Sequence, residues 1–303
     1  MAALFRGKVR EAVRWFGMRF RPSFMAVTAT FALVATPAVG ILAERLHDER
    51  AVAAARLEAA DQALRAQMLE QGFQPLERLE AATALDTALG VELLVAERPF
   101  RLELMTGTLS GSPPDEAAVR RVSEVVRVEL SRYPRAFFRA SRLRRVILCA
   151  DLHENSVAIP SLPNYHATLL LDVGSSTEFL KRLLHHELFH FADYADDDQL
   201  QRDPDWERLN DHWFSYGSGG RFLREPGSAR FEPDMHGFVS KYSRSALEED
   251  KAEIFAFLMT KPQAMAELSA RDSIVAAKAA FVKHEVERLV PALDERFWAA
   301  VSR

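Results

Sequence analysis

Apolar residues recur at helical spacing through most of the chain and form strand-like runs at only a few places. Residues 43–71 are rich in Ala, Glu, Arg and Leu and carry one narrow apolar stripe, which predicts a long helix that is solvated on most of its surface. Gly72 and Pro75 interrupt this pattern, and residues 76–89 predict a second helical segment. The two segments form either a stalk or a layer that packs on the domain after them, and the pattern is compatible with both.

Three short runs predict the strands of a small mixed sheet. Residues 100–104 alternate between apolar and polar, as in a half-buried strand. Residues 146–150 and 167–173 are continuously apolar and rich in β-forming residues, as in strands that are buried on both faces. The polar, proline-rich residues 112–115 have the signature of a helix start. Helices and strands in this arrangement indicate an α+β fold.

The last third of the chain is helical after one long irregular segment. Residues 246–259 and 264–303 carry helical periodicity, and the second stretch is long enough for two or three helices. Between about 196 and 238 the chain is polar and glycine-rich, with Trp206 and Trp213 embedded in it. Irregular segments of this length usually serve a function, and we expect this one to do so.

The N-terminal region combines basic residues with an uncharged apolar segment. Residues 24–42 contain no charged side chain and are long enough to cross a bilayer as a helix. Six basic residues precede this segment against one acid, so the positive-inside rule leaves residues 1–23 in the cytoplasm and the rest of the chain outside. Apolar residues at helical spacing lie opposite these cations, which is typical of a helix on an anionic membrane surface.

Two other interpretations of this region stay open. Small residues around Ala38 and Gly40 would suit a signal peptidase, in which case the protein is secreted after cleavage. Pro37 and three threonines weaken the segment as a membrane span, and a buried core helix would also explain it. We expect a retained single-pass anchor in a bacterial inner membrane, with the domains after it on the extracytoplasmic side.

Composition excludes several classes of protein. The 303 residues are 48% hydrophobic and 27% charged, as in an ordinary globular chain. A formal net charge of -4 argues against nucleic acid as a partner, because a nucleic-acid-binding domain is strongly basic. The single cysteine, Cys149, excludes an internal disulfide and a zinc site built from several cysteines. The sequence also lacks a phosphate-binding glycine loop before a helix and the G-x-S-x-G pattern of serine hydrolases.

The strongest chemical signal lies in an apolar helix with a capping box. Ser175 and Glu178 have the spacing at which the serine caps the helix and the glutamate reaches back to it. The helix continues into HELFH at 186–190, and because residues four apart share one helix face, His186 and His190 can bind a single ion. Glu187 lies beside that face, where it can act as a general base. This is the H-E-x-x-H pattern of zinc peptidases.

A catalytic zinc takes three protein ligands, so a third must come from elsewhere in the chain. His212 and His236 are candidates, but both lie in loop sequence without a supporting pattern. Glu249 and Glu253 are four apart on the predicted helix 246–259 and therefore share one face. One of them can bind the metal while the other hydrogen-bonds a ligand histidine. A solvated acidic helix surface is the alternative explanation for these two carboxylates.

Three segments together resemble a known family. HELFHFADYA at 186–195, KYSR at 241–244 and EEDKAEIFAF at 248–257 resemble the zinc-binding half of the anthrax lethal factor catalytic domain and its bacterial relatives, which are gluzincin-type metallopeptidases. The resemblance covers about residues 167–259. The long segment at 196–238 departs from the family in length and composition, so substrate preference is not carried over.

The resemblance implies a role for each matching residue. The implied ligands of one zinc ion per chain are His186, His190 and Glu249. Glu187 takes the position of the catalytic base, and Tyr242 that of a tyrosine that stabilises the oxyanion. Glu253 and Asp193 match acidic positions next to the ligands, where they would support the ligands without binding the metal.

These observations predict a membrane-anchored zinc endopeptidase that acts on peptide or protein substrates. We expect strand 167–173 to form the sheet edge along which an extended substrate docks. The alternatives are a non-catalytic scaffold module with a zincin-like fold and a metal-dependent hydrolase of another substrate. The predicted segments are a basic segment 1–23, a transmembrane helix 24–42, a helical stalk 43–90, a zincin-like catalytic domain 91–262 and a C-terminal helical extension 263–303.

Overall fold

The computed structural model describes residues 52, 55–56, 58–104, 107–164, 167–197, 199–220 and 227–302. The chain divides into two compact units, Met1–Ala63 and Leu64–Arg303. The predicted basic segment and transmembrane helix lie outside the described residues. Among the residues that are described, no helix has both the length and the apolar character that a membrane span requires. Of the helix predicted over residues 43–71, residues 58–70 are described as helical throughout.

The described part of the second unit contains an eight-stranded mixed sheet. Its strands are β1 (Phe73–Pro75), β2 (Glu92–Ala96), β3 (Phe100–Leu104), β4 (Gly107–Ser112), β5 (Arg145–Glu154), β6 (Val157–Ala158), β7 (Ser161–Asn164) and β8 (Thr168–Asp172). Strands β1, β2, β5, β4 and β3 follow one another in space, while β8 pairs with β5 and β7 pairs with β8. The mixed α+β class predicted from the hydrophobic pattern is confirmed.

Strand β5 joins two parts of the sheet because its two halves have different neighbours. Its first half pairs in parallel with β2 and β8, and its second half pairs antiparallel with β4 and β6. Asp151, at the transition, has a φ of 53°, a left-handed conformation that aspartate tolerates better than most residues. The register of β4 also shifts between Ser110 and Ser112. The bend therefore falls where the pairing changes.

The two apolar runs form strands that are buried on both faces. Along β5, Val146 and Leu148 belong to a large core on one face, whereas Ile147 and Cys149 belong to a smaller core on the other. Side chains of a strand alternate between faces, so a strand with two covered faces is continuously apolar in sequence. This is why the runs at 146–150 and 167–173 lack the alternation of a half-buried strand.

The expected position of one strand in the sheet is wrong. The run at 167–173 forms β8, which lies between β5 and β7 and is therefore not an edge. The edge is β7, whose Ser-Leu-Pro-Asn sequence carries no strand signal of its own. A proline is tolerated there because an edge strand leaves some backbone N–H groups without a partner in the sheet.

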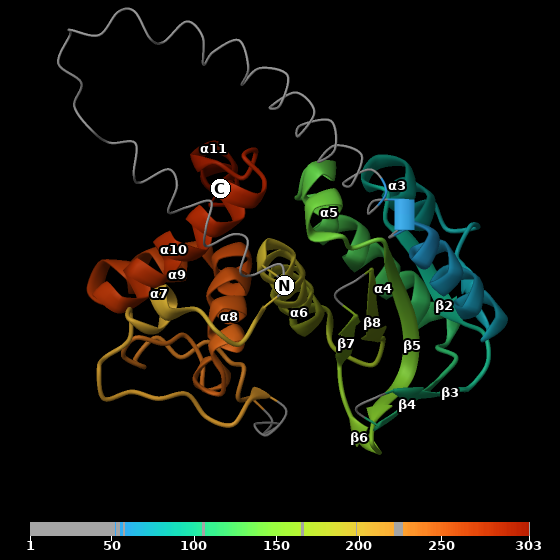
Figure 1. The fold of residues 1–303 in the computed structure, drawn as a ribbon, viewed down its shortest axis with the longest axis horizontal. Helices are drawn as coiled ribbons and strands as arrows, with labels where there is room; N and C mark the ends of the chain where they lie inside the picture. The colour runs from blue at the N-terminus through green and yellow to red at the C-terminus, as the bar shows by residue number, and fades with distance from the viewer. Residues whose placement is uncertain are drawn as a thin grey trace, which may run out of the picture. The chain divides into compact units, whose positions relative to one another are not determined.

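Helices pack with the sheet to form the larger core, and Figure 1 shows how most of these helices are arranged. They are α3 (Glu80–Leu89), α4 (Glu116–Leu130), α5 (Arg135–Ser141), α6 (Thr177–Asp197), α7 (Pro204–Glu207), the short 3-10 helix η2 (Tyr242–Arg244), α8 (Leu247–Thr260), α9 (Pro262–Arg271), α10 (Ser273–Leu289) and α11 (Glu295–Val301). Helix α6 runs between the sheet and the group formed by α8 to α11 (Figure 1). Helix α3 contributes Ala82, Leu85 and Leu89 to this core, so residues 80–89 are part of the second unit.

Helix α6 begins one residue later than the capping box requires. The backbone N–H of Phe179 donates to Oγ of Ser176 at 3.3 Å, so the cap is Ser176 and not Ser175. Glu178 points instead toward Lys261, with 3.7 Å between its Oε1 and the lysine Nζ. The helix itself is present as predicted, and it presents Leu180, Leu184 and other apolar residues to the core.

Candidate metal centre

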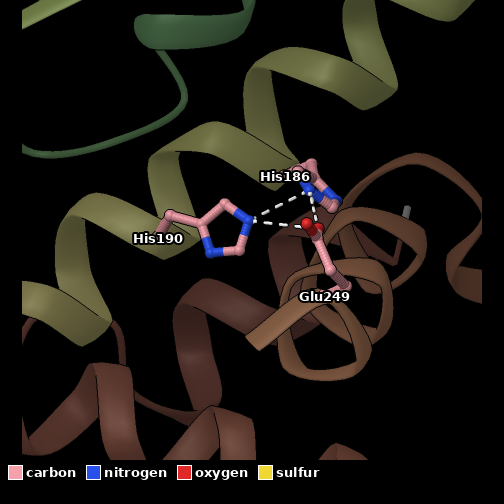
Figure 2. A group of neighbouring side chains, drawn as sticks. All are labelled: His186, His190 and Glu249. Carbon is pink, nitrogen blue, oxygen red and sulfur yellow. Dashed lines mark hydrogen bonds and ion pairs between the residues drawn. The ribbon is translucent and has the colours of Figure 1, made fainter. Parts of the chain in front are cut away.

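Two helices meet at a group of three side chains that have the donor atoms of a metal site (Figure 2). His186 and His190 lie one turn apart on α6, and Glu249 lies in the first turn of α8. Nε2 of His186 is 3.1 Å from Nε2 of His190 and 3.0 Å from Oε2 of Glu249. Nε2 of His190 is 3.4 Å from the same carboxylate oxygen. Each residue thus offers one atom to a common point.

The spacing of these atoms fits a zinc ion. Bonds of about 2.0–2.2 Å in tetrahedral geometry place neighbouring ligand atoms about 3.3–3.6 Å apart, so the observed separations need to widen only slightly. Two imidazoles and a carboxylate are a donor set that zinc accepts, and they leave a fourth position open. Among the described residues, His186, His190 and Glu249 are the group of three His, Cys, Asp or Glu side chains close enough to share one ion.

The charges at the centre favour a cation between the histidines and Glu249. Burial opposes protonation of His186, but hydrogen bonds to Glu249 and Glu253 outweigh it and raise the pKa of the imidazole to about 10. Burial likewise opposes ionisation of Glu249, but its contacts with the two histidines lower the pKa of this carboxyl well below its usual range. A centre that holds a proton this firmly also offers a strong electrostatic attraction to a metal cation.

Glu253 contacts His186 on the side of the ring opposite Glu249. Its Oε1 lies 3.0 Å from Nδ1 of His186, and because an ionised carboxylate only accepts hydrogen bonds, this ring nitrogen must carry the proton. Nε2 of His186 is then the nitrogen that faces the common point. Ser240 donates to Oε2 of Glu253 at 2.7 Å, and Arg182 forms an ion pair with its Oε1. The carboxylate is fully buried and has partners on both oxygens.

Two further predicted residues face the cleft beside the centre. Glu187 and Tyr242 both line an open cleft of about 1440 Å³ that also includes the two histidines. Tyr242 donates to Oε1 of Glu249 at 3.1 Å. Burial and the charges of Glu249 and Glu187 raise the pKa of its phenol, so Tyr242 stays a protonated donor at ordinary pH. The centre is therefore accessible from solvent on one side and has a proton donor and a carboxylate beside it.

The glycine-rich loop passes directly over Glu249 and Tyr242. A Cβ atom at Gly220 would collide with Oε1 of Glu249 and Oη of Tyr242, so a larger residue would displace one of them. The backbone N–H of Gly219 donates to the carbonyl of Ser245 at 2.9 Å, which holds this part of the loop against the start of α8. The loop therefore packs against these two residues, and a larger side chain at residue 220 would disturb them.

A buried polar network fixes the same loop to α8. Oη of Tyr216 accepts from Trp206 and Asn210, each at 2.9 Å, and donates to Asp250 at 2.7 Å. Lys278, on α10, donates to the same carboxylate oxygen at 2.6 Å. Asp250 directly follows the glutamate of the centre, so α10 and the loop both restrain the turn of α8 that carries it.

Asp193 lies in a second cluster, next to the centre. Nζ of Lys251 is 3.0 Å from Asp193, 2.7 Å from Asp203 and 3.0 Å from Glu285. Burial raises the pKa of Asp193, while Lys251 and His190 act in the opposite direction. Burial, together with the charge of Asp193, raises the pKa of Glu285 to about 7, although Lys251 opposes this rise. Asp193 thus connects α6 to α8 and α10 through a buried lysine.

The structure separates the alternative third ligands from the centre and adds a residue that the sequence analysis missed. His212 is exposed, and His236 lies beside a small pocket with its Nδ1 3.0 Å from Asp272. Ser161, on β7, donates to Oε1 of Glu187 at 2.6 Å. A lone serine in a short polar run carries no signal in sequence, because its contact depends on where the sheet edge meets α6.

Comparison with known proteins does not show a family for this chain. No model of a known protein family and no curated protein matches the chain. Among solved structures, the fold is similar to that of a candidate zinc-binding metallo-peptidase from Bacteroides caccae, with a TM-score of 0.45 and 17% sequence identity over 74% of this chain and 93% of that one.

Proposed function

We propose that the protein is a zinc-dependent endopeptidase. The observation that carries this proposal is the convergence of His186, His190 and Glu249 within 4.8 Å of one another. The two histidines line an open cleft, and Glu187 and Tyr242 line the same cleft. Three protein ligands with an adjacent carboxylate are the arrangement that hydrolytic zinc sites use, because one position stays open for the reaction.

In the proposed reaction, each residue has a separate task. Zinc, when bound, would act as a Lewis acid on the peptide carbonyl and make water nucleophilic near neutral pH. Glu187 accepts the proton of the attacking water and later delivers it to the leaving amine. Tyr242 donates a hydrogen bond to the oxygen on which negative charge develops. Glu253 keeps the ring of His186 in one orientation and one tautomer through its Nδ1 atom.

The edge strand β7 is the surface on which we propose that an extended substrate docks. Ser161, Leu162 and Pro163 of this strand line the cleft. A peptide added to a sheet edge gains backbone hydrogen bonds that do not depend on its sequence. This replaces the expectation that the run at 167–173 is the docking edge, because that run forms an interior strand. An open cleft beside a sheet edge favours cleavage within a chain over removal of terminal residues.

We also propose that residues 24–42 anchor the protein in a membrane, with residues 1–23 cytoplasmic and the metal centre extracytoplasmic. The uncharged length of this segment and the six cations before it support the proposal. A reporter enzyme that folds only outside the cytoplasm, fused after Leu42, should be active. A silent reporter would contradict both the anchor and the secreted alternative, whereas release of the reporter into the medium would favour cleavage.

The proposed activity is tested by peptide hydrolysis with the zinc-loaded full chain. A mixture of quenched fluorescent peptides should be cleaved internally by the wild type and not by Glu187→Gln, in which zinc content should be unchanged. Equal cleavage by the variant would remove Glu187 from its role. No cleavage by a folded, zinc-loaded wild type would contradict the peptidase and favour the scaffold module.

A further inference from the structure

The carboxylate of Glu187 has one engaged and one unengaged oxygen. Oε1 accepts a hydrogen bond from Oγ of Ser161 at 2.6 Å. Oε2 is buried and finds no hydrogen-bond partner among the described residues. Both side chains line the cleft that contains the two histidines. A buried carboxylate oxygen without a partner is costly, so its presence on a residue that lines the cleft indicates a functional role.

The two partners of this hydrogen bond belong to different elements. Glu187 lies on α6, between the histidines of the centre, and Ser161 lies on β7, paired opposite Leu171 of β8. The sheet fixes the backbone of Ser161, and the helix fixes that of Glu187. The hydrogen bond therefore connects the two elements that border the cleft at the point where the proposed base stands.

We propose that Ser161 is the positioning residue of the general base. This inference rests on the proposed function and deepens it. A glutamate side chain has several rotamers, and the hydroxyl of Ser161 selects the one in which Oε1 is anchored and Oε2 is free to accept a proton. Small displacements of a reacting group lower the rate of a reaction strongly, by up to about a hundredfold for 1 Å. Loss of the hydroxyl therefore affects turnover more than substrate binding.

The position of Ser161 also relates substrate docking to the base. Ser161 is the first residue of the edge strand on which the peptide is proposed to pair. The strand that would align the substrate thus also aligns the carboxylate that acts on it.

The test compares three variants of the full chain after zinc loading. Ser161→Ala removes the hydroxyl, and Ser161→Thr keeps it. Ser112→Ala is the matched control, because Ser112 donates to Asp151 at 2.7 Å on another strand, away from the cleft. With the quenched fluorescent peptides, we expect Ser161→Ala to lower kcat about tenfold while KM changes less than about twofold. Ser161→Thr should restore kcat to within about threefold of the wild type, and Ser112→Ala should leave both constants unchanged.

A second readout does not depend on activity. In crystal structures of the zinc-loaded protein, the Glu187 carboxylate should have one orientation in the wild type and should turn away or split into two conformers in Ser161→Ala. An unmoved carboxylate would overturn the proposal, as would an unchanged kcat or a change in KM alone. If the wild type cleaves no peptide, the peptidase proposal fails, and the orientation of Glu187 still decides whether Ser161 positions it.

Discussion

Nδ1 of His186 lies 3.0 Å from Oε1 of the fully buried Glu253, on the side of the ring that faces away from the metal centre. The opposite nitrogen of the same ring is 3.0 Å from Glu249. Two carboxylates on one helix therefore contact the two nitrogens of one imidazole. The carboxylate of Glu253 fixes the orientation of the ring. The carboxylate of Glu249 lies where it and His186 can bind the same ion.

Replacing Glu253 should weaken zinc binding without removing a ligand. Loss of a partner that orients a ligand histidine lowers metal affinity by about 10–100-fold. Glu253→Gln keeps the shape of the side chain, so its zinc affinity should fall by an amount near the lower end of this range. Glu253→Ala also leaves Arg182 without its buried carboxylate, so its zinc affinity should fall further. A competition titration with a chromophoric chelator measures the affinity. An affinity equal to that of the wild type in Glu253→Gln would contradict the orienting role.

Tyr242→Phe should separate turnover from metal binding. The variant loses only the donor that is proposed to stabilise the oxyanion, and loss of such a donor costs about a hundredfold in kcat or more. Zinc affinity should change little, because the phenol contacts Glu249 and is not itself part of the three-atom group. Tyr194→Phe, on α6 and outside the cleft, is the control. An unchanged kcat in Tyr242→Phe would eliminate the tyrosine from the proposed mechanism.

Local spacing was sufficient to predict part of the centre, and the reason is physical. His186, Glu187 and His190 are related by the geometry of a single helix, which sequence spacing determines. Glu249 required a second helix to arrive at the first, and only its i, i+4 partner Glu253 and the family resemblance indicated it. The structure brings these residues together, and their binding of zinc stays a prediction.

Most of the parts that the sequence did not predict depend on contacts between distant segments. Strand β7 is short, polar and interrupted by Pro163, so its pairing with β8 could not be read from hydrophobic alternation. Ser161 gains its partner only through that pairing. The cap of α6 was misplaced by one residue because Ser175 and Ser176 are equally good caps in sequence. Lys278 meets Asp250 across 28 residues, a contact with no local signature.

Lowering the pH should remove one contribution to the stability of the fold that does not depend on the metal. Burial opposes ionisation of Glu129, but hydrogen bonds from His185 and Arg132 outweigh it and lower the pKa of this carboxyl to about 2 from an ordinary value of 4.5. A carboxyl with a lowered pKa stabilises the fold above its unfolded value and loses that contribution as pH falls through the folded value. The increment is therefore full above about pH 4.5 and disappears toward pH 2.

Glu129→Gln tests this window. At pH 7 the free energy of unfolding of the variant should be about 1–3 kcal/mol lower than that of the wild type. This difference should shrink as the pH falls from 5 to 2. Chemical unfolding at several pH values measures it. Glu116→Gln, at the exposed start of the same helix, removes a solvent-exposed pair with Arg120 and should change the stability by less than about 1 kcal/mol at any pH. A difference that persists undiminished at pH 2 would contradict the assigned cause.

Helix α10 should be required for the metal centre although it contributes no ligand. Lys278 and Asp250 form a fully buried ion pair, and removing one partner of such a pair costs about 3–5 kcal/mol. Lys278→Met should therefore lower both the melting temperature and the zinc content, because Asp250 adjoins Glu249 on α8. Arg288→Met, also on α10, removes a largely exposed ion pair with Asp196 of α6 and should change neither measurably. If Lys278→Met is destabilised but keeps its full zinc content, α10 is not required for the metal centre.

The most direct test of the account is the zinc content of the full chain and of its Glu249→Ala variant, measured by elemental analysis after removal of loosely bound metal. Glu248→Ala, at the neighbouring position of α8, is the matched control. We expect close to one zinc per chain in the wild type and in the control, and a sharp loss in Glu249→Ala. Absence of zinc from a folded wild type that is supplied with it would contradict the metal centre, and zinc retained in Glu249→Ala would show that the third ligand is another group.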